Sequence, residues 1–340
     1  MKRKRKIVIF VLLLLIIAAF VPTPYYIYEP GSVEELSAKV NVEDGNKNAK
    51  GHFYLTTIFS IEASNIYHLA YALLTPYTEI KKTSEVQADL SDEEYSNLLS
   101  FMMRDSKQNA IVASFNQANV KTNINYQGIF VKGIREDSKA KGVLQVGDII
   151  TMVDGKNIIE VQEFTRYLDE NKKVGDLVNL AVQRNGKTVT KEVEVIGLQN
   201  EKVGLGIIPE EDFTVTTNDK KVELDSEDIG GPSAGLMFSL EIFNQLTSID
   251  YTKGYKVAGT GTIDHMGNVG QIGGIKHKVT SASREGIDIF FVPKDINEVD
   301  ANEKDALEEV KENNYTLKVI PVASLKEAVD YLKTIPENKK

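Results

Sequence analysis

The segment from Gly230 to Gly235, with the sequence Gly-Gly-Pro-Ser-Ala-Gly, restricts the fold of this 340-residue chain more than any other. Its glycines let another backbone segment approach closely, because no Cβ atom stands in the way. Pro232 fits the first turn of a helix, where the N–H that proline lacks would have no partner. The apolar run 236–243 predicts that this helix is buried. Ser233 is therefore expected at a helix N-terminus, where free N–H groups and the helix dipole stabilise a developing negative charge.

A serine in this position is a nucleophile only if a base accepts its proton. The four histidines, His52, His68, His265 and His277, are widely spaced and form no H-E-x-x-H zinc pattern. A lysine held in its neutral form is then the natural candidate for the base. The alternative interpretation is that the glycine-rich turn only starts a helix or cradles a phosphate.

The last third of the chain, residues 204–337, alternates predicted strands with predicted helices. This alternation indicates a mixed α/β (α+β) fold. The expected elements follow one another as strand 256–263, helix 274–285, strand 287–292, helix 302–313, strand 317–322 and helix 325–332.

Composition excludes several classes of protein. The chain contains no cysteine, which rules out disulfides, thiolate zinc sites and a cysteine nucleophile. Its formal net charge is −9 at pH 7, and no broad basic face exists beyond the N-terminus, so no nucleic-acid partner is expected. No metal site is expected either.

The N-terminus has the pattern of a membrane segment. Five basic residues, 2–6, precede an unbroken apolar run, residues 7–21. Fifteen helical residues reach ~22 Å, less than the ~30 Å hydrocarbon core, and snorkelling by Lys6 and local thinning of the bilayer can close that gap. We expect an uncleaved, single-pass transmembrane anchor over residues 7–21, with a cytoplasmic N-terminus and an extracellular catalytic domain at the cell membrane. A cleaved signal peptide is the alternative.

Residues 118–198 carry a different set of signals, in the order strand, Gly-Asp turn, Asp-Gly turn, helix and Asn-Gly hairpin. These features lie at 128–131, 147–148, 154–155, 161–168 and 185–186. Their order resembles a PDZ domain of the kind found with bacterial proteases. The resemblance implies that a peptide adds as a strand beside Ile129, Phe130 and Val131. The alternative is a small β-rich domain without a ligand.

Residues 230–235 and 261–278 together resemble the proteolytic domain of Lon-type proteases. The second segment contains Gly-Gly-Ile-Lys-His-Lys, similar to the Gly-Gly-x-x-x-Lys motif of that family. The resemblance implies that Ser233 is the nucleophile, that Lys278 is the general base and that Thr260 helps to position the lysine amine. Lon-type domains often form rings, so a homo-oligomer is considered as well.

Two features depart from that family. Gly230 stands where many Lon enzymes carry an acidic residue, and Asp228 lies two residues earlier. The sequence also contains no Walker A lysine loop, so no ATPase motor and no nucleotide cofactor are expected. Substrates are then expected to be short, flexible or already unfolded.

The region before the PDZ-like block, residues 33–117, also resembles part of a Lon-type domain. The pattern Met-x-x-Ser-x-x-x-Ala, from Met103 to Ala110, is similar to a helix in the first part of that domain, and 53–58 is a candidate early strand. We therefore expect the PDZ-like module to be inserted into the Lon-type fold, with a tandem order as the alternative.

Two nearby lysines can be separated by helix geometry. On a helix that begins near Gly274, Ile275 and Val279 mark the buried stripe, and Lys278 lies beside it. Lys276 instead shares its side with polar residues. Since a lysine must be desolvated to lose its proton near neutral pH, Lys278 is predicted to be the base and Lys276 a surface residue.

Together these features predict a membrane-anchored, ATP-independent serine endopeptidase with a serine–lysine dyad. It would cleave extracytoplasmic peptides or unfolded proteins recruited by the PDZ-like module. A non-enzymatic surface adaptor with a degenerate peptidase fold is the alternative from another class, and a regulatory partner of a separate ATPase is a third.

Overall fold

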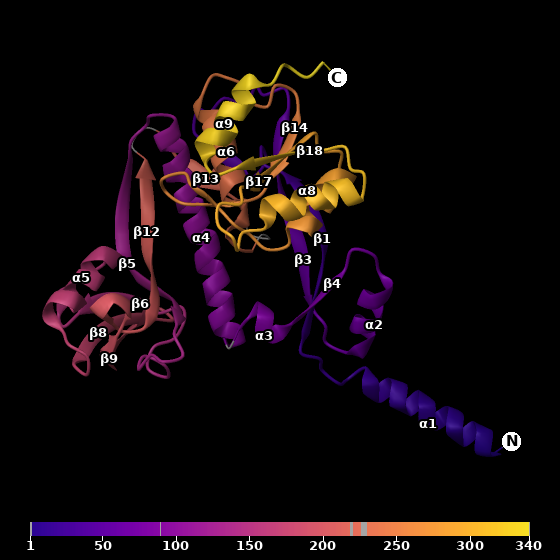
Figure 1. Cartoon of the computed structure of the whole chain (residues 1–340), viewed down its shortest axis with the longest axis horizontal. Helices are drawn as coiled ribbons and strands as arrows, with labels where there is room; N and C mark the ends of the chain where they lie inside the picture. The colour runs from indigo at the N-terminus through magenta and orange to yellow at the C-terminus, as the bar shows by residue number, and fades with distance from the viewer. Residues whose placement is uncertain (1, 89, 218–219, 226–229, 340) are drawn as a thin grey trace.

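A computed structural model of the chain describes residues 2–88, 90–217, 220–225 and 230–339. Asp228 lies outside these described residues. Figure 1 shows a mixed α/β body, a β-rich module beside it and a helix that projects from the N-terminus. The predicted mixed α/β class is therefore confirmed.

The body is built on a six-stranded sheet that joins segments from both ends of the chain. β1 is antiparallel to β3 and β4, whereas β3, β14, β17 and β18 run parallel to one another. The strands, in spatial order, are β18 (Lys318–Val322), β17 (Ile289–Pro293), β14 (Lys256–Gly259), β3 (His52–Glu62), β1 (Tyr25–Glu35) and β4 (Glu79–Lys82).

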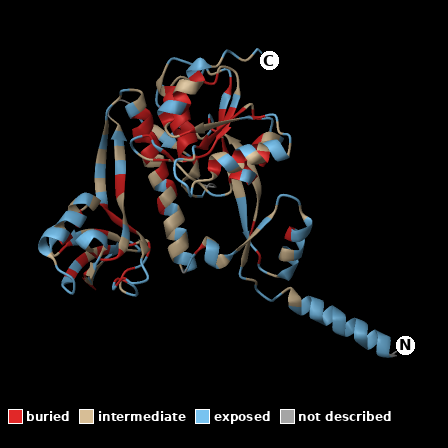
Figure 2. Cartoon of the chain, viewed as in Figure 1, coloured by how far each residue is buried: buried red, intermediate tan, exposed pale blue. Residues whose placement is uncertain are grey.

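Helices cover both faces of this sheet. Successive residues of a strand point to opposite faces, so neighbouring residues pack against different helices. Val257 and Phe291 pack toward α4 (Asp92–Gln117), α6 (Gly235–Leu246) and α9 (Leu325–Thr334). The adjacent Ala258 and Phe290 pack toward α7 (Ile275–Arg284) and α8 (Asn302–Glu312). Figure 2 shows the buried residues gathered in this layered region.

The β-rich module lies between two segments that pair with each other in the body. β3 and β14 are neighbouring parallel strands, with Phe53 opposite Val257. The chain between them leaves the body through β5 (Thr122–Ile134) and returns through β12 (Ile207–Thr217), which form one long antiparallel ribbon. The module has its own apolar core.

The module's sheet has the order β12-β5-β6-β8-β9, with β7 paired to β6. Its helix, α5, spans Val161–Asn171. The remaining strands of the module are β6 (Ile149–Val153), β7 (Lys156–Asn157), β8 (Leu177–Arg184), β9 (Lys187–Glu194), β10 (Ile196–Gly197) and β11 (Val203–Gly204), and η1 (Gln199–Glu201) is a short 3₁₀ turn.

Small elements complete the body. Two of them, α2 and α3, lie in the stretch 61–90, which the sequence pattern leaves unassigned. The elements are β2 (Val40–Val42) paired with β13 (Val222–Leu224), β15 (Thr262–Ile263) paired with β16 (Val269–Gly270), α2 (Ile66–Leu74), α3 (Thr83–Val86) and the 3₁₀ turn η2 (Pro232–Ala234).

The N-terminal helix, α1, spans Lys2–Ala18 and therefore differs from the anchor expected over residues 7–21. It has 17 residues, and its first turns are basic. In the part of the chain that the structure describes, every helix is too short or too polar to cross a membrane. The predicted transmembrane helix is thus not supported.

Candidate active site

Ser233 lies on η2, immediately before α6, as the glycine-proline pattern predicts. Gly231 makes this turn possible with a φ of 83°, in the left-handed region that favours glycine. Gly235 allows close packing, because a Cβ atom there would lie 2.8 Å from Ser106 Oγ. Ser106, on α4, donates a hydrogen bond of 3.0 Å to the Pro232 carbonyl and so holds the turn against the body.

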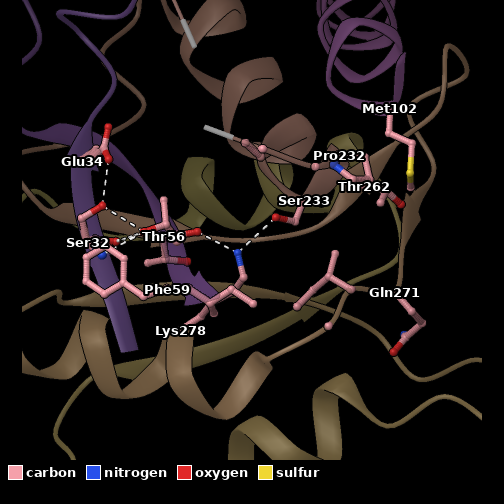
Figure 3. A pocket seen from close by; sticks show the side chains of 17 residues that line it. Ser32, Glu34, Thr56, Phe59, Met102, Pro232, Ser233, Thr262, Gln271 and Lys278 are labelled. Atoms are coloured by element: carbon pink, nitrogen blue, oxygen red, sulfur yellow. Dashed lines mark hydrogen bonds between the residues drawn. The ribbon is translucent and has the colours of Figure 1, made fainter. Parts of the chain in front are cut away.

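Lys278 reaches Ser233 from the opposite side, from the end of the first turn of α7 (Figure 3). Its Nζ donates hydrogen bonds to Ser233 Oγ at 3.1 Å and to the Thr56 carbonyl at 2.7 Å. The side chain is only 3% exposed, and this burial lowers the pKa of Lys278 from 10.5 to about 7. Desolvation penalises the ammonium form, so a large share of the amine is neutral at neutral pH.

The two lysines of α7 lie as helix geometry predicts. Lys276 is exposed, with its Nζ 3.9 Å from a Glu308 carboxylate oxygen. Thr280 lies one turn after Lys276, on the side expected to be polar. It is nonetheless buried, and its hydroxyl is satisfied by a 2.9 Å hydrogen bond that it donates to Glu309 of α8.

Thr260 lies beside the serine but does not take the expected role of positioning the lysine amine. It is fully buried, and its hydroxyl donates to the Ser233 carbonyl at 3.0 Å. The Gly261 N–H donates to the same oxygen at 2.9 Å. The lysine amine is oriented instead by the Thr56 carbonyl on β3. Any residue can supply a backbone carbonyl, so residue types alone give no signal for this contact.

A cavity of about 690 Å³ opens over the pair. Its size lies within the range of ligand pockets, ~300–1,000 Å³. Apolar side chains, glycines and a few polar groups form the walls. The lining residues are Ser32, Glu34, Thr56, Thr57, Ile58, Phe59, Met102, Gly230, Gly231, Pro232, Ser233, Ala234, Thr262, Gln271, Ile272, Gly273 and Lys278.

Ile129, Phe130 and Val131 cannot accept an added peptide strand in this structure. Both edges of β5 are occupied there, since Phe130 lies opposite Glu210 of β12 and Ile129 lies opposite Ile150 of β6. All three side chains are also buried. Among the described strands, the free edges of this sheet belong to β12 and β9. The expected peptide-binding strand therefore has to be corrected.

The described residues include no group of histidine, cysteine or acidic side chains that could hold a metal ion. The cavity brings together the Ser233 hydroxyl, the buried Lys278 amine and the backbone of the η2 turn.

Comparisons with known proteins find relatives for both the β-rich module and the body. Residues 223–334 match the Lon protease (S16) C-terminal proteolytic domain, and residues 98–195 match the PDZ domain. The Lon protease of Vibrio parahaemolyticus is 30% identical over 226 residues, which cover 58% of this chain and 27% of the relative. The Lon protease of Aster yellows witches'-broom phytoplasma is 31% identical over 127 residues, covering 37% of this chain and 14% of the relative.

Other relatives resemble the module. The serine protease Do-like HtrA of Lactobacillus helveticus is 39% identical over 79 residues, which cover 23% of this chain and 19% of the relative. The solved PDZ domain of an SdrC-like protein from Listeria monocytogenes is 31% identical and covers 26% of this chain and 92% of that chain, with a TM-score of 0.24. The chain spans less than a third of the length of each curated relative named here. The chain therefore carries a PDZ domain and the proteolytic domain of a Lon-type serine peptidase.

Proposed function

We propose that this chain is an endopeptidase in which Ser233 is the nucleophile and Lys278 is the general base. The observation that carries the proposal is the 3.1 Å contact between Lys278 Nζ and Ser233 Oγ, made by an amine whose pKa burial lowers to about 7. A neutral amine offers a lone pair to the serine proton, whereas an ammonium group has none to offer.

In the proposed reaction, the Ser233 hydroxyl attacks a peptide carbonyl while its proton passes to Lys278. Backbone N–H groups of the η2 turn around Ser233 stabilise the resulting oxyanion, since the first N–H groups of α6, those of Gly235 and Leu236, already donate to Pro232 and Gly261. The protonated amine then gives its proton to the leaving nitrogen, which releases the first product and leaves an ester on Ser233. Water, activated by the same amine, hydrolyses the ester and restores the serine. Throughout, the Thr56 carbonyl accepts a hydrogen bond from the amine and fixes its direction.

The proposal includes activity without nucleotide, since the sequence has no phosphate-binding lysine loop. Polypeptides that are flexible or unfolded would then be the substrates. The PDZ domain would recruit them, and the free edge of β12 is a better place for an added strand than the enclosed strand β5.

The proposal also includes a location at the cell membrane, with the catalytic domain on the extracytoplasmic side. Its support is the basic start of α1 and the apolar side chains Ile7 to Ile17, each at least 47% exposed. Membrane fractionation, followed by protease treatment of intact cells, tests this part. Recovery of the chain in the soluble fraction would contradict it.

The decisive experiment compares the full chain with Ser233→Ala and with a control, Ser283→Ala, on the solvent side of α7. An unfolded, fluorescently labelled protein serves as the substrate in nucleotide-free buffer. The wild type and Ser283→Ala should release peptides at similar rates, and Ser233→Ala should release none. Equal activity of all three proteins would sink the assignment, and a strict requirement for ATP would contradict the nucleotide-independent mechanism.

A further inference from the structure

Helix α2 (Ile66–Leu74) presents an apolar face to solvent. Its sequence, Ile-Tyr-His-Leu-Ala-Tyr-Ala-Leu-Leu, contains no Asp, Glu, Lys or Arg. One side packs on the body, where Leu69 and Ala72 join a small cluster with Ile27. The other side stays open although water-facing helix surfaces normally carry charged residues. Its exposed side chains are Ile66 (53%), Tyr67 (41%), Tyr71 (54%), Leu73 (78%) and Leu74 (86%).

This face lies next to the end of α1. The Tyr67 hydroxyl donates a hydrogen bond to the Leu15 carbonyl, and Figure 1 shows α2 beside the point where α1 leaves the body. Figure 2 shows α1 exposed along its length. Two uncovered apolar surfaces therefore lie at the same end of the molecule, joined by this hydrogen bond.

The composition of this end favours a lipid surface over a second copy of the chain. Tyr67 and Tyr71 combine an apolar ring with a polar hydroxyl, which suits the boundary between hydrocarbon and headgroups. The basic residues 2–6 at the far end of α1 suit anionic headgroups. An interfacial helix with leucines on its outer face buries them ~5–10 Å into such a boundary.

We propose that the outer face of α2 docks onto the lipid–water interface of a bilayer, beside α1, and holds the catalytic domain against the membrane. This inference rests on the membrane location proposed above. It adds a second contact, which would prevent the domain from turning freely about α1.

The segments on either side of α2 connect the proposed lipid contact with the active site. Beyond α2, the Tyr77 ring lies 4.9 Å from the Arg284 guanidinium, and Glu79 lies 3.4 Å from His277 Nε2. Both partners are on α7, the helix that carries Lys278. On the other side of α2, Ile61 is 47% exposed, and Phe59, which lines the catalytic cavity, is 52% exposed. An apolar strip thus leads from the cavity toward α2, and the substrate class that fits is a polypeptide segment close to the membrane surface.

Because the chain contains no tryptophan, single tryptophans can report lipid contact in the full-length protein. The variants are Leu74→Trp on α2, Leu13→Trp on α1 and a control, Ile249→Trp, which is 55% exposed. Ile249 precedes Asp250, whose carboxylate accepts the Lys50 N–H before β3, while α2 follows the opposite end of that 11-residue strand. The control thus lies about 36 Å away along β3.

Each variant is reconstituted into vesicles of anionic phospholipid and brominated phosphatidylcholine, and tryptophan emission is excited selectively. Leu13→Trp and Leu74→Trp should be quenched by about twofold or more, as expected for side chains at interfacial depth, and Ile249→Trp should not. Quenching of Leu13→Trp alone would overturn the docking of α2 but leave the membrane location intact. If neither is quenched, the membrane location fails as well. Concentration-dependent shielding of Leu74→Trp without vesicles would assign the face to a second copy and also overturn the inference.

A functional measurement completes the test. The double variant Leu73→Ser, Leu74→Ser should cleave a vesicle-anchored peptide several-fold more slowly than the wild type and a soluble peptide of the same sequence at the wild-type rate. Equal effects on both peptides would show that the leucines serve the fold and would overturn the proposal.

Discussion

Replacing Lys278 by methionine should abolish turnover and, at neutral pH, make the fold more stable. The pKa of this lysine is about 7 in the folded chain against 10.5 for an exposed lysine. One pKa unit corresponds to ~1.4 kcal/mol. Burial of the amine therefore lowers the free energy of unfolding by about 5 kcal/mol at a pH where the unfolded lysine is fully protonated. Methionine fills a similar volume without that cost, although the Thr56 carbonyl then loses a donor at ~1–3 kcal/mol.

The sign of the pH dependence separates the lysine term from the packing terms. Between pH 7 and 10.5 the unfolded chain holds a proton on Lys278 that the folded chain does not, so wild-type stability rises with pH in this window. The advantage of Lys278→Met should therefore shrink by ~1.4 kcal/mol per pH unit from pH 7 to pH 10. The methionine packing and the lost hydrogen bond contribute a constant offset.

Urea unfolding of the full chain at pH 7, 8, 9 and 10, followed by circular dichroism, measures this difference. Lys276→Met is the matched control, because Lys276 lies on the same helix but is exposed, and the change with pH should be larger for Lys278→Met than for this control. A difference for Lys278→Met that is independent of pH would refute the claim that this amine is neutral in the folded protein.

Further expected outcomes concern the catalytic turn. Because only the neutral amine accepts a proton, kcat/KM on a soluble peptide should rise about tenfold per pH unit below about pH 7, the pKa of Lys278, and level off above it; a flat profile from pH 5 to 8 would contradict the assignment. Ser106→Ala removes the hydrogen bond to the Pro232 carbonyl and should cost ~1 kcal/mol in urea unfolding together with a lower kcat, whereas an unchanged kcat would show that the bond does not position the turn. Gly235→Ala places a Cβ atom 2.7 Å from an Ile263 methyl group and should destabilise the fold by ~1–3 kcal/mol. A thermal unfolding midpoint equal to that of the wild type would show that the neighbouring side chains move aside without cost.

The parts of the site that depend on local signals follow from the sequence. Glycine and proline fix the turn before Ser233, and Gly274 and Gly286 bound the helix of Lys278, both with left-handed φ values of 71° and 67°. Ser91 caps α4 in a capping box with Glu94, and the first turn of that helix is acidic. These features are set within a few residues, where sequence patterns carry physical information.

The features of the fold and the site that depend on pairing between distant segments cannot be predicted from the sequence. The enclosure of β5 is invisible locally, because its partner β12 lies about 80 residues further along the chain. The Thr56 contact joins residues separated by 222 positions. Helix α2 gives no clear signal for another reason. Its sequence lacks the polar face that marks a surface helix, and a short apolar run fits a strand or a buried segment equally well.

Under the proposed mechanism, the pairing of β3 with β14 determines when peptide cleavage can begin. In an unfolded chain Lys278 is an ordinary ammonium group and cannot take a proton from any serine. In this mechanism the amine becomes a base only after strand β3, from the first fifth of the sequence, has closed over it and supplied the Thr56 carbonyl. Under the proposed mechanism, folding would take the place of the cleavage that removes the inhibitory segment of a zymogen, and a chain still being synthesised would have no peptidase activity.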